Sequence, residues 1–125
     1  MRIVDRKTFL TLPKGTVFMK FTPQIFGTIC IKGDTIDVAD VGDFTYTDFE
    51  TPDTASDTET MDLLDAAATT DTTFRMSLDL GSRDGLFDED QLFAVFQISD
   101  LDRMIHRLAE ARRSVYRINT HPLLT

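Results

Sequence analysis

The sequence predicts an α+β domain with a mainly antiparallel sheet of about five strands, a C-terminal amphipathic helix packed on that sheet, and shorter helices. Two observations lead to this fold class. Stretches of alternating apolar and polar residues recur along the 125-residue chain and are bounded by turn-forming residues. The last apolar stripe repeats instead with helical spacing. The length favours one domain over residues 1–125, because two domains would each bury too little core.

The first part of the chain predicts one short helix followed by strands. Asp5 is a suitable N-cap for a helix over 6–11, and Pro13 ends that helix. Alternation predicts strands over residues 16–21, 26–32 and 43–49. The first two of these strands form an antiparallel hairpin with a short loop. Residues 35–41 fit either a short strand or an irregular link.

The middle of the chain predicts a loop, a short helix and two further strands. Threonine, aspartate and serine dominate residues 50–60, which therefore predict a loop. The remaining elements are a helix over 61–68, a strand over 72–80, a turn over 81–85 and a strand over 92–98. The alternation in 72–80 is the cleanest in the chain and predicts a strand with one face on the core.

The final helix is predicted by an apolar stripe with i, i+3, i+4 and i+7 spacing. Ser99 is its expected N-cap, with Asp102 in the capping-box position. The stripe consists of Leu101, Met104, Ile105, Leu108, Ala111 and Val115. The predicted order of elements is α-β-β-β-α-β-β-α, and the order of the strands within the sheet stays open.

Composition limits the compartment and the class of protein. The sequence has no apolar run of the roughly 20 residues that a membrane-spanning helix needs. Its N-terminal residues do not match a signal peptide. Cys30 is the single cysteine, which excludes an internal disulfide framework and suits a reducing compartment. We therefore expect a soluble, cytoplasmic protein with no membrane partner.

Charge is distributed very unevenly along the chain. Residues 1–33 have a net charge of +5, residues 34–102 of -17, and residues 103–125 of +4, which together give the formal net charge of -8. An acidic face of this strength disfavours direct binding of nucleic acid or anionic lipid. It permits a basic protein as a partner, including one that itself binds nucleic acid.

The favoured interpretation is therefore a non-enzymatic binding protein that engages a basic partner through an acidic surface. The candidate residues of that surface form two groups. The first group is Asp48, Glu50, Asp53, Asp57, Glu59 and Asp62. The second group is Asp84, Asp88, Glu89 and Asp90.

Two alternatives remain open. Arg103, Arg107 and Arg113 of the final helix could hold a small anionic ligand such as a nucleotide, because guanidinium groups bind phosphate and carboxylate bidentately. A concave pocket walled by these arginines would favour this reading. The other alternative is a structural or assembly subunit, which predicts a symmetric, mostly apolar self-contact. The oligomeric state is not predicted.

Catalytic and metal-binding patterns are weak in this sequence. The acidic run over 84–90 does not fit a calcium-binding EF-hand, because Leu80 and Gln91 fall where Asp and Glu ligands are needed. The only thiol and imidazoles belong to Cys30, His106 and His121, and no third group is placed to orient a base. We expect no enzyme activity, no metal and no cofactor.

Several short segments resemble small uncharacterised proteins encoded by phages and prophages. They are Leu12–Thr16, Phe26–Gly27, Lys32–Ile36 and Arg83–Phe93, which together cover about a third of the chain. None of them is a functional motif, so no site residue follows from the resemblance. It implies a context only, that of a small accessory protein, including one that acts against a host system.

Overall fold

The fold class of the sequence prediction is confirmed: the protein is α+β, with an antiparallel sheet and three helices among the described residues. The computed structural model describes residues 1–37 and 41–116. The strands are β1 (Arg2–Val4), β2 (Val17–Thr22), β3 (Ile25–Phe26), β4 (Cys30–Ile36), β5 (Asp43–Thr47), β6 (Ser82–Arg83) and β7 (Leu92–Val95). The helices are α1 (Arg6–Leu10), α2 (Asp57–Ala67) and α3 (Ile98–Val115).

Every strand pair in the sheet is antiparallel, and the order is β1-β7-β2-β4-β5-β6, with β3 pairing only with β2. β7 lies between the two N-terminal strands, where Ala94 is paired with Ile3 on one side and Met19 on the other. β1 and β6 were not predicted from the sequence. Both are very short edge strands, and alternation is not detectable over two or three residues.

The predicted N-terminal hairpin is confirmed, with one change. β2 turns into β3 through Pro23 and Gln24. The φ of Gln24 is +69°, which matches the third position of a type II turn. The single second strand expected over 26–32 is split into β3 and β4. β4 also continues through Gly33, beyond the predicted end of that strand at residue 32. A Cβ on Gly33 would lie 2.2 Å from Thr45 Oγ1, so only glycine fits this position of the sheet.

Four phenylalanine rings form the centre of the core, where α1 covers one face of the sheet. Asp5 caps α1 as predicted, because its carboxylate accepts a hydrogen bond from Thr8 N at 2.8 Å. The helix places the Phe9 ring on the sheet. There it stacks on Phe93, with centroids 4.0 Å apart, and meets Phe18 and Phe44 edge-on at 4.7 and 5.0 Å.

The prediction of a sheet strand over 72–80 is wrong. This segment makes only an isolated bridge between Met76 and Pro52, and its apolar side chains Phe74, Met76 and Leu78 are exposed. Alternation in the sequence shows that the two faces of an extended segment differ. It does not show that a core covers either face.

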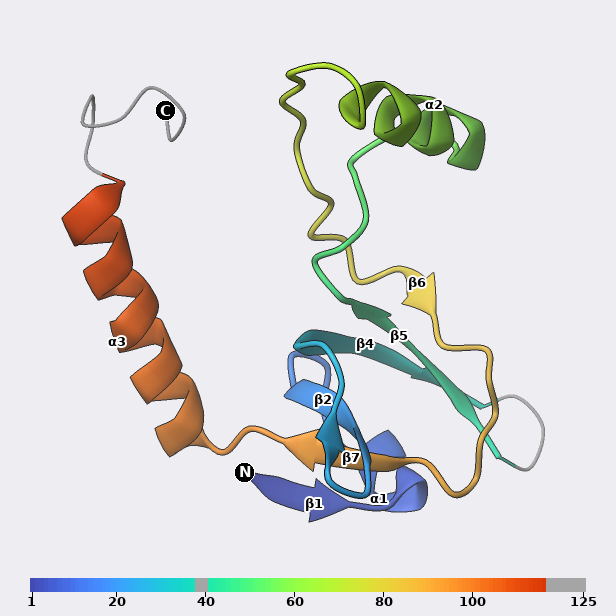
Figure 1. The fold of residues 1–125 in the computed structure, drawn as a ribbon. Helices are drawn as coiled ribbons and strands as arrows, with labels where there is room; N and C mark the ends of the chain where they lie inside the picture. Colours follow the sequence, from blue (N-terminus) through green and yellow to red (C-terminus); the bar gives the residue numbers. More distant parts are fainter. Residues whose placement is uncertain (38–40, 117–125) are drawn as a thin grey trace.

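The two later predicted helices are present, but their first residues, and the capping and packing of α3, differ from the prediction. α2 begins four residues earlier than expected, at Asp57. α3 begins at Ile98, and Asp100, not Asp102, accepts the capping hydrogen bond, from Gln97 N at 3.0 Å. α3 also does not pack on the sheet: it runs away from the end of β7 (Figure 1). The physical reason is that α1 already occupies the core face, and only Phe96 and Gln97 separate β7 from α3.

Within residues 1–37 and 41–116, no helix is both long and apolar enough to cross a bilayer.

Candidate protein-binding surface

The most acidic part of the molecule is a single projecting segment, which we call the acidic arm and define as residues 48–81. The chain leaves the sheet after β5, carries α2 at the far end, and returns to the sheet at β6 (Figure 1). The arm contains nine carboxylates and one basic residue, Arg75. Its formal charge of -8 therefore equals that of the whole chain. All six residues of the first predicted group lie on this arm.

Two extended segments form the stem of the acidic arm. Asp53 N donates to Arg75 O at 2.8 Å, and Ser77 N donates to Thr51 O at 2.7 Å. The bridged pair Pro52 and Met76 lies between these two hydrogen bonds, and Pro52 is buried. The segment expected as a sheet strand thus holds the two sides of the stem together.

α2 is capped by side chains of the acidic arm itself. Ser56 Oγ accepts a hydrogen bond from Glu59 N at 3.2 Å, and Glu59 Oε2 accepts one from Ala55 N at 3.1 Å. This reciprocal pattern is similar to a capping box, except that Glu59 accepts from Ala55, the residue before the N-cap, and not from Ser56. Asp57 and Glu59 also place negative charge at the positive end of the helix dipole. No residue of α2 is buried, so its carboxylates remain open to solvent and to a partner.

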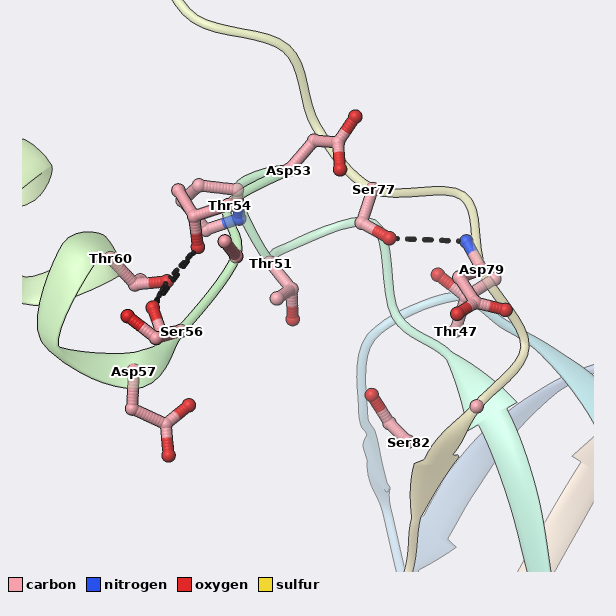
Figure 2. A pocket seen from close by; sticks show the side chains of 13 residues that line it. Thr47, Thr51, Asp53, Thr54, Ser56, Asp57, Thr60, Ser77, Asp79 and Ser82 are labelled. Atoms are coloured by element: carbon pink, nitrogen blue, oxygen red, sulfur yellow. Dashed lines mark hydrogen bonds between the residues drawn. The ribbon is translucent and has the colours of Figure 1, made fainter.

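A cleft of about 410 Å³ lies between the start of α2, the stem and the edge of the sheet (Figure 2). Its lining is rich in hydroxyl groups, and no basic side chain contributes to it. The polar lining residues are Thr47, Thr51, Asp53, Thr54, Ser56, Asp57, Thr60, Ser77, Asp79 and Ser82. Such a lining accepts hydrogen bonds from ammonium and guanidinium groups and repels anions.

The cleft does not form a metal centre. Its three aspartates are spread around the opening and do not converge on one point (Figure 2). Among the described residues, no three His, Cys, Asp or Glu side chains group closely enough to hold a metal ion. The hydroxyl residues of the cleft were missed in the sequence analysis. The available signal was the high density of Ser and Thr in residues 51–60, which was interpreted only as a loop.

The second predicted group does not join the acidic arm. Asp88, Glu89 and Asp90 are exposed in the loop between β6 and β7, which lies apart from α2 (Figure 1). Asp84 does not belong to an exposed face at all, because its carboxylate is buried. It lies 2.5 Å from Lys20 Nζ and 3.4 Å from Arg6 Nη1. Two cations from distant parts of the chain thus neutralise this charge.

Asp43 extends this buried ionic cluster. Burial alone would raise the pKa of Asp43, but hydrogen bonds from Gly85 N, Arg83 and Phe44 N outweigh burial and lower it. Arg83 binds one carboxylate oxygen through Nε and Nη2 at 3.0 and 2.7 Å. Arg6 completes the cluster: its Nη2 donates to Gly42 O at 2.9 Å, and its guanidinium lies over the Phe44 ring. These residues therefore stabilise the fold instead of facing a partner.

The arginines of α3 lie beside an open hollow, but acidic groups share it. Arg103 and Arg107 line this hollow together with Asp100, Asp102 and Glu110, whereas Arg113 is not part of its lining. Glu110 accepts from Arg107 at 3.4 Å and lies 2.8 Å from His106 Nε2. An anionic ligand would meet nearly balanced charge here.

The thiol and the imidazole considered for catalysis belong to different parts of the structure. Cys30 is buried in β4, and burial raises the pKa of its thiol. His106 lies on α3, which leaves the sheet at the end of β7 (Figure 1). His121 lies outside the described residues.

No family model, no curated protein and no solved structure matches the chain.

Proposed function

We propose that this protein is a non-enzymatic binding protein that engages a basic partner protein through the acidic arm. The observation that carries the proposal is the arm itself: nine carboxylates on one projecting, solvent-exposed segment that contains Arg75 as its one basic residue. Like charges held this close repel one another and lower the stability of the free protein. A basic partner relieves that repulsion and is attracted over a distance, which raises the rate of encounter.

The hydroxyl-lined cleft supports the same proposal. A lysine or arginine side chain of the partner fits a site lined by hydroxyls and by Asp53, Asp57 and Asp79. Direct nucleic acid or anionic lipid binding finds no support in this surface. The buried, single Cys30 suits a reducing compartment, so we place the protein in the cytoplasm. The accessory role implied by the resemblance to phage proteins is compatible with such a partner.

The alternative of an anionic small-molecule site finds less support. Three carboxylates share the hollow of Arg103 and Arg107, and Arg113 is absent from its lining. The alternative of an assembly subunit is favoured by one specific observation, the exposed apolar side of α3.

Binding to a defined basic probe tests the proposal. Titrating a fluorescent decalysine peptide into the full chain at about 50 and about 300 mM salt should show binding that weakens as salt rises. Removing four charges from the arm, in the variant Glu50→Gln, Asp53→Asn, Asp57→Asn and Asp62→Asn, should weaken binding at low salt at least about tenfold and flatten the salt dependence. Glu59 is left intact because it caps α2.

The matched control removes four charges outside the arm, in the variant Asp34→Asn, Asp88→Asn, Glu89→Gln and Asp90→Asn. All four of these residues are exposed. Each variant removes four negative charges, so both variants have the same net charge. Retained binding in the control assigns the effect to the arm. Equal weakening in both variants would mean that only net charge matters, and the proposal would then be wrong. The same pair of variants then serves to identify the natural partner from a lysate of the source cell.

A further inference from the structure

α3 presents an apolar side that no other described element covers. Ile98, Ile105 and Leu108 are 73, 54 and 61 % exposed, although the surface of a soluble helix is normally polar. The opposite side of α3 carries Asp100, Arg103, His106, Arg107 and Glu110. The helix is thus strongly amphipathic, and its apolar side faces solvent in the single chain.

The apolar residues follow the spacing of a coiled coil. Ile98, Leu101, Ile105 and Leu108 alternate by three and four residues, which places isoleucine at the a positions and leucine at the d positions of a heptad repeat. Val115 continues the same spacing at a d position. A seam of this kind packs against a matching seam, and a second copy of the chain supplies one.

Arg112 determines the direction of such a pairing. It occupies the a position that follows Leu108. In a parallel pair, Arg112 would face Arg112 of the second copy inside the seam, where two like charges repel. In an antiparallel pair centred between His106 and Arg107, each Ile105 meets Leu108 of the other copy, and each Arg112 meets Leu101.

The antiparallel pair also provides a counter-charge. Asp102 follows Leu101 at the e position, on the same side of the seam as Arg112. Its carboxylate therefore lies beside Arg112 of the second copy. Within one helix, Asp102 and Arg112 are about 15 Å apart along the axis and do not meet. Asp102 and Arg112 can thus form an ion pair with each other across two copies but not within one helix.

We infer that α3 is a self-association surface, on which two copies of this protein pair through antiparallel α3 helices. The interface is isologous, with a twofold axis between His106 and Arg107. It uses residues distinct from the acidic arm, so the arm of each copy stays free to bind a partner. This inference does not rest on the function proposed for the arm.

Sedimentation equilibrium of the full chain over about 1 to 200 μM tests the inference. The expected result is a reversible equilibrium between a 14.2 kDa monomer and its dimer. The variant Ile105→Asp with Leu108→Asp should be monomeric throughout. The control variant, Ser99→Asp with His106→Asp, adds the same two charges to the polar side of α3 and should still dimerise. A monomeric native chain at every concentration would overturn the inference.

A charge exchange tests the direction of the helices. Asp102→Arg and Arg112→Asp should each weaken the dimer at least about tenfold, because each places like charges together across the seam. The double variant should restore most of the native affinity, because it rebuilds the pair with the charges exchanged. Failure of the double variant to recover would overturn the antiparallel arrangement. The acidic-arm variant should dimerise as the native chain does, which separates this surface from the proposed binding function.

Discussion

Lys32 is a buried cation, and among the described residues no carboxylate forms an ion pair with its ammonium group. Its side chain is 1 % exposed, its Nζ donates to Thr35 Oγ1 at 2.6 Å and Gly33 O at 3.3 Å, and the ring of Phe9 lies beside it. Burial lowers the pKa of Lys32, and the nearby charge of Asp34 only partly opposes this shift. The folded protein therefore holds this proton less tightly than the unfolded chain does.

Replacing this lysine tests the linkage between its charge and stability. The pKa of Lys32 in the folded protein is below its unfolded value of 10.5. The free energy of unfolding therefore rises as pH rises through the folded-state pKa toward 10.5, and it falls as pH is lowered through the same range. The variant Lys32→Met should therefore be more stable than the native chain at pH 7, by about 1 kcal/mol. Urea denaturation at pH 7 and at pH 10 measures the difference, which should shrink at the higher pH.

The exposed lysine Lys14 provides the control, because Lys14→Met should leave stability nearly unchanged at both pH values. A loss of stability in Lys32→Met at pH 7 would show that the hydrogen bonds to Thr35 and Gly33 outweigh the cost of burying the charge. The burial of Lys32, like that of Asp84, could not be predicted from the sequence. It depends on which residues from other strands lie next to each charge, and alternation does not specify those neighbours.

At the scale of elements, predictions from the sequence succeeded where the signal was local. The cap of α1 and the hairpin of β2 depend on residues within a few positions of one another, and both are found as expected. The packing of α3 and the role of 72–80 depend on which surface is still free when the chain reaches them. The sheet face was already covered by Phe9 of α1, and no periodicity in α3 reveals that.

α2 depends more on its cap than on packing, because none of its residues is buried. The variant Ser56→Ala removes the acceptor for Glu59 N and should cost the helix about 1 kcal/mol. Hydrogen exchange of amides in α2 should therefore become faster by roughly fivefold, since 1.4 kcal/mol corresponds to a factor of ten. Exchange in β2 and β7 should not change. Thr58→Ala, in the exposed first turn of the same helix, should leave exchange in α2 unchanged or slower.

At the scale of the whole molecule, the acidic arm and the core are separable. The buried apolar core consists of Val4, Phe9, Phe18, Cys30, Phe44 and Phe93, and none of these residues lies on the arm. The arm therefore adds charge and surface to a sheet whose core is already complete. This division agrees with the sequence, where the loop-like, acidic composition of 50–60 marked the segment with least to bury.

Shortening the arm tests this separation. Ser77 N already donates to Thr51 O, which is the hydrogen bond that closes a two-residue turn. Replacing residues 52–76 by Asn-Gly should therefore give a hairpin and leave one cooperative unfolding transition at nearly the native temperature. Differential scanning calorimetry measures this unfolding transition. Phe9→Ala is the comparison variant, and it should lower the melting temperature strongly. Loss of the cooperative transition in the shortened chain would show that the arm contributes to the core.

The position of β7 also affects how the protein is made. β1 and β2 leave the ribosome early, yet the strand that pairs with both of them is the last of the seven to be synthesised. Until Leu92–Val95 emerges, Phe18 and Phe21 lie on a strand with an open edge, and the ring of Phe9 lacks Phe93. Folding of the sheet is thus delayed until late in translation, and nascent chains that stop before Leu92 expose strand edges that can pair with other chains.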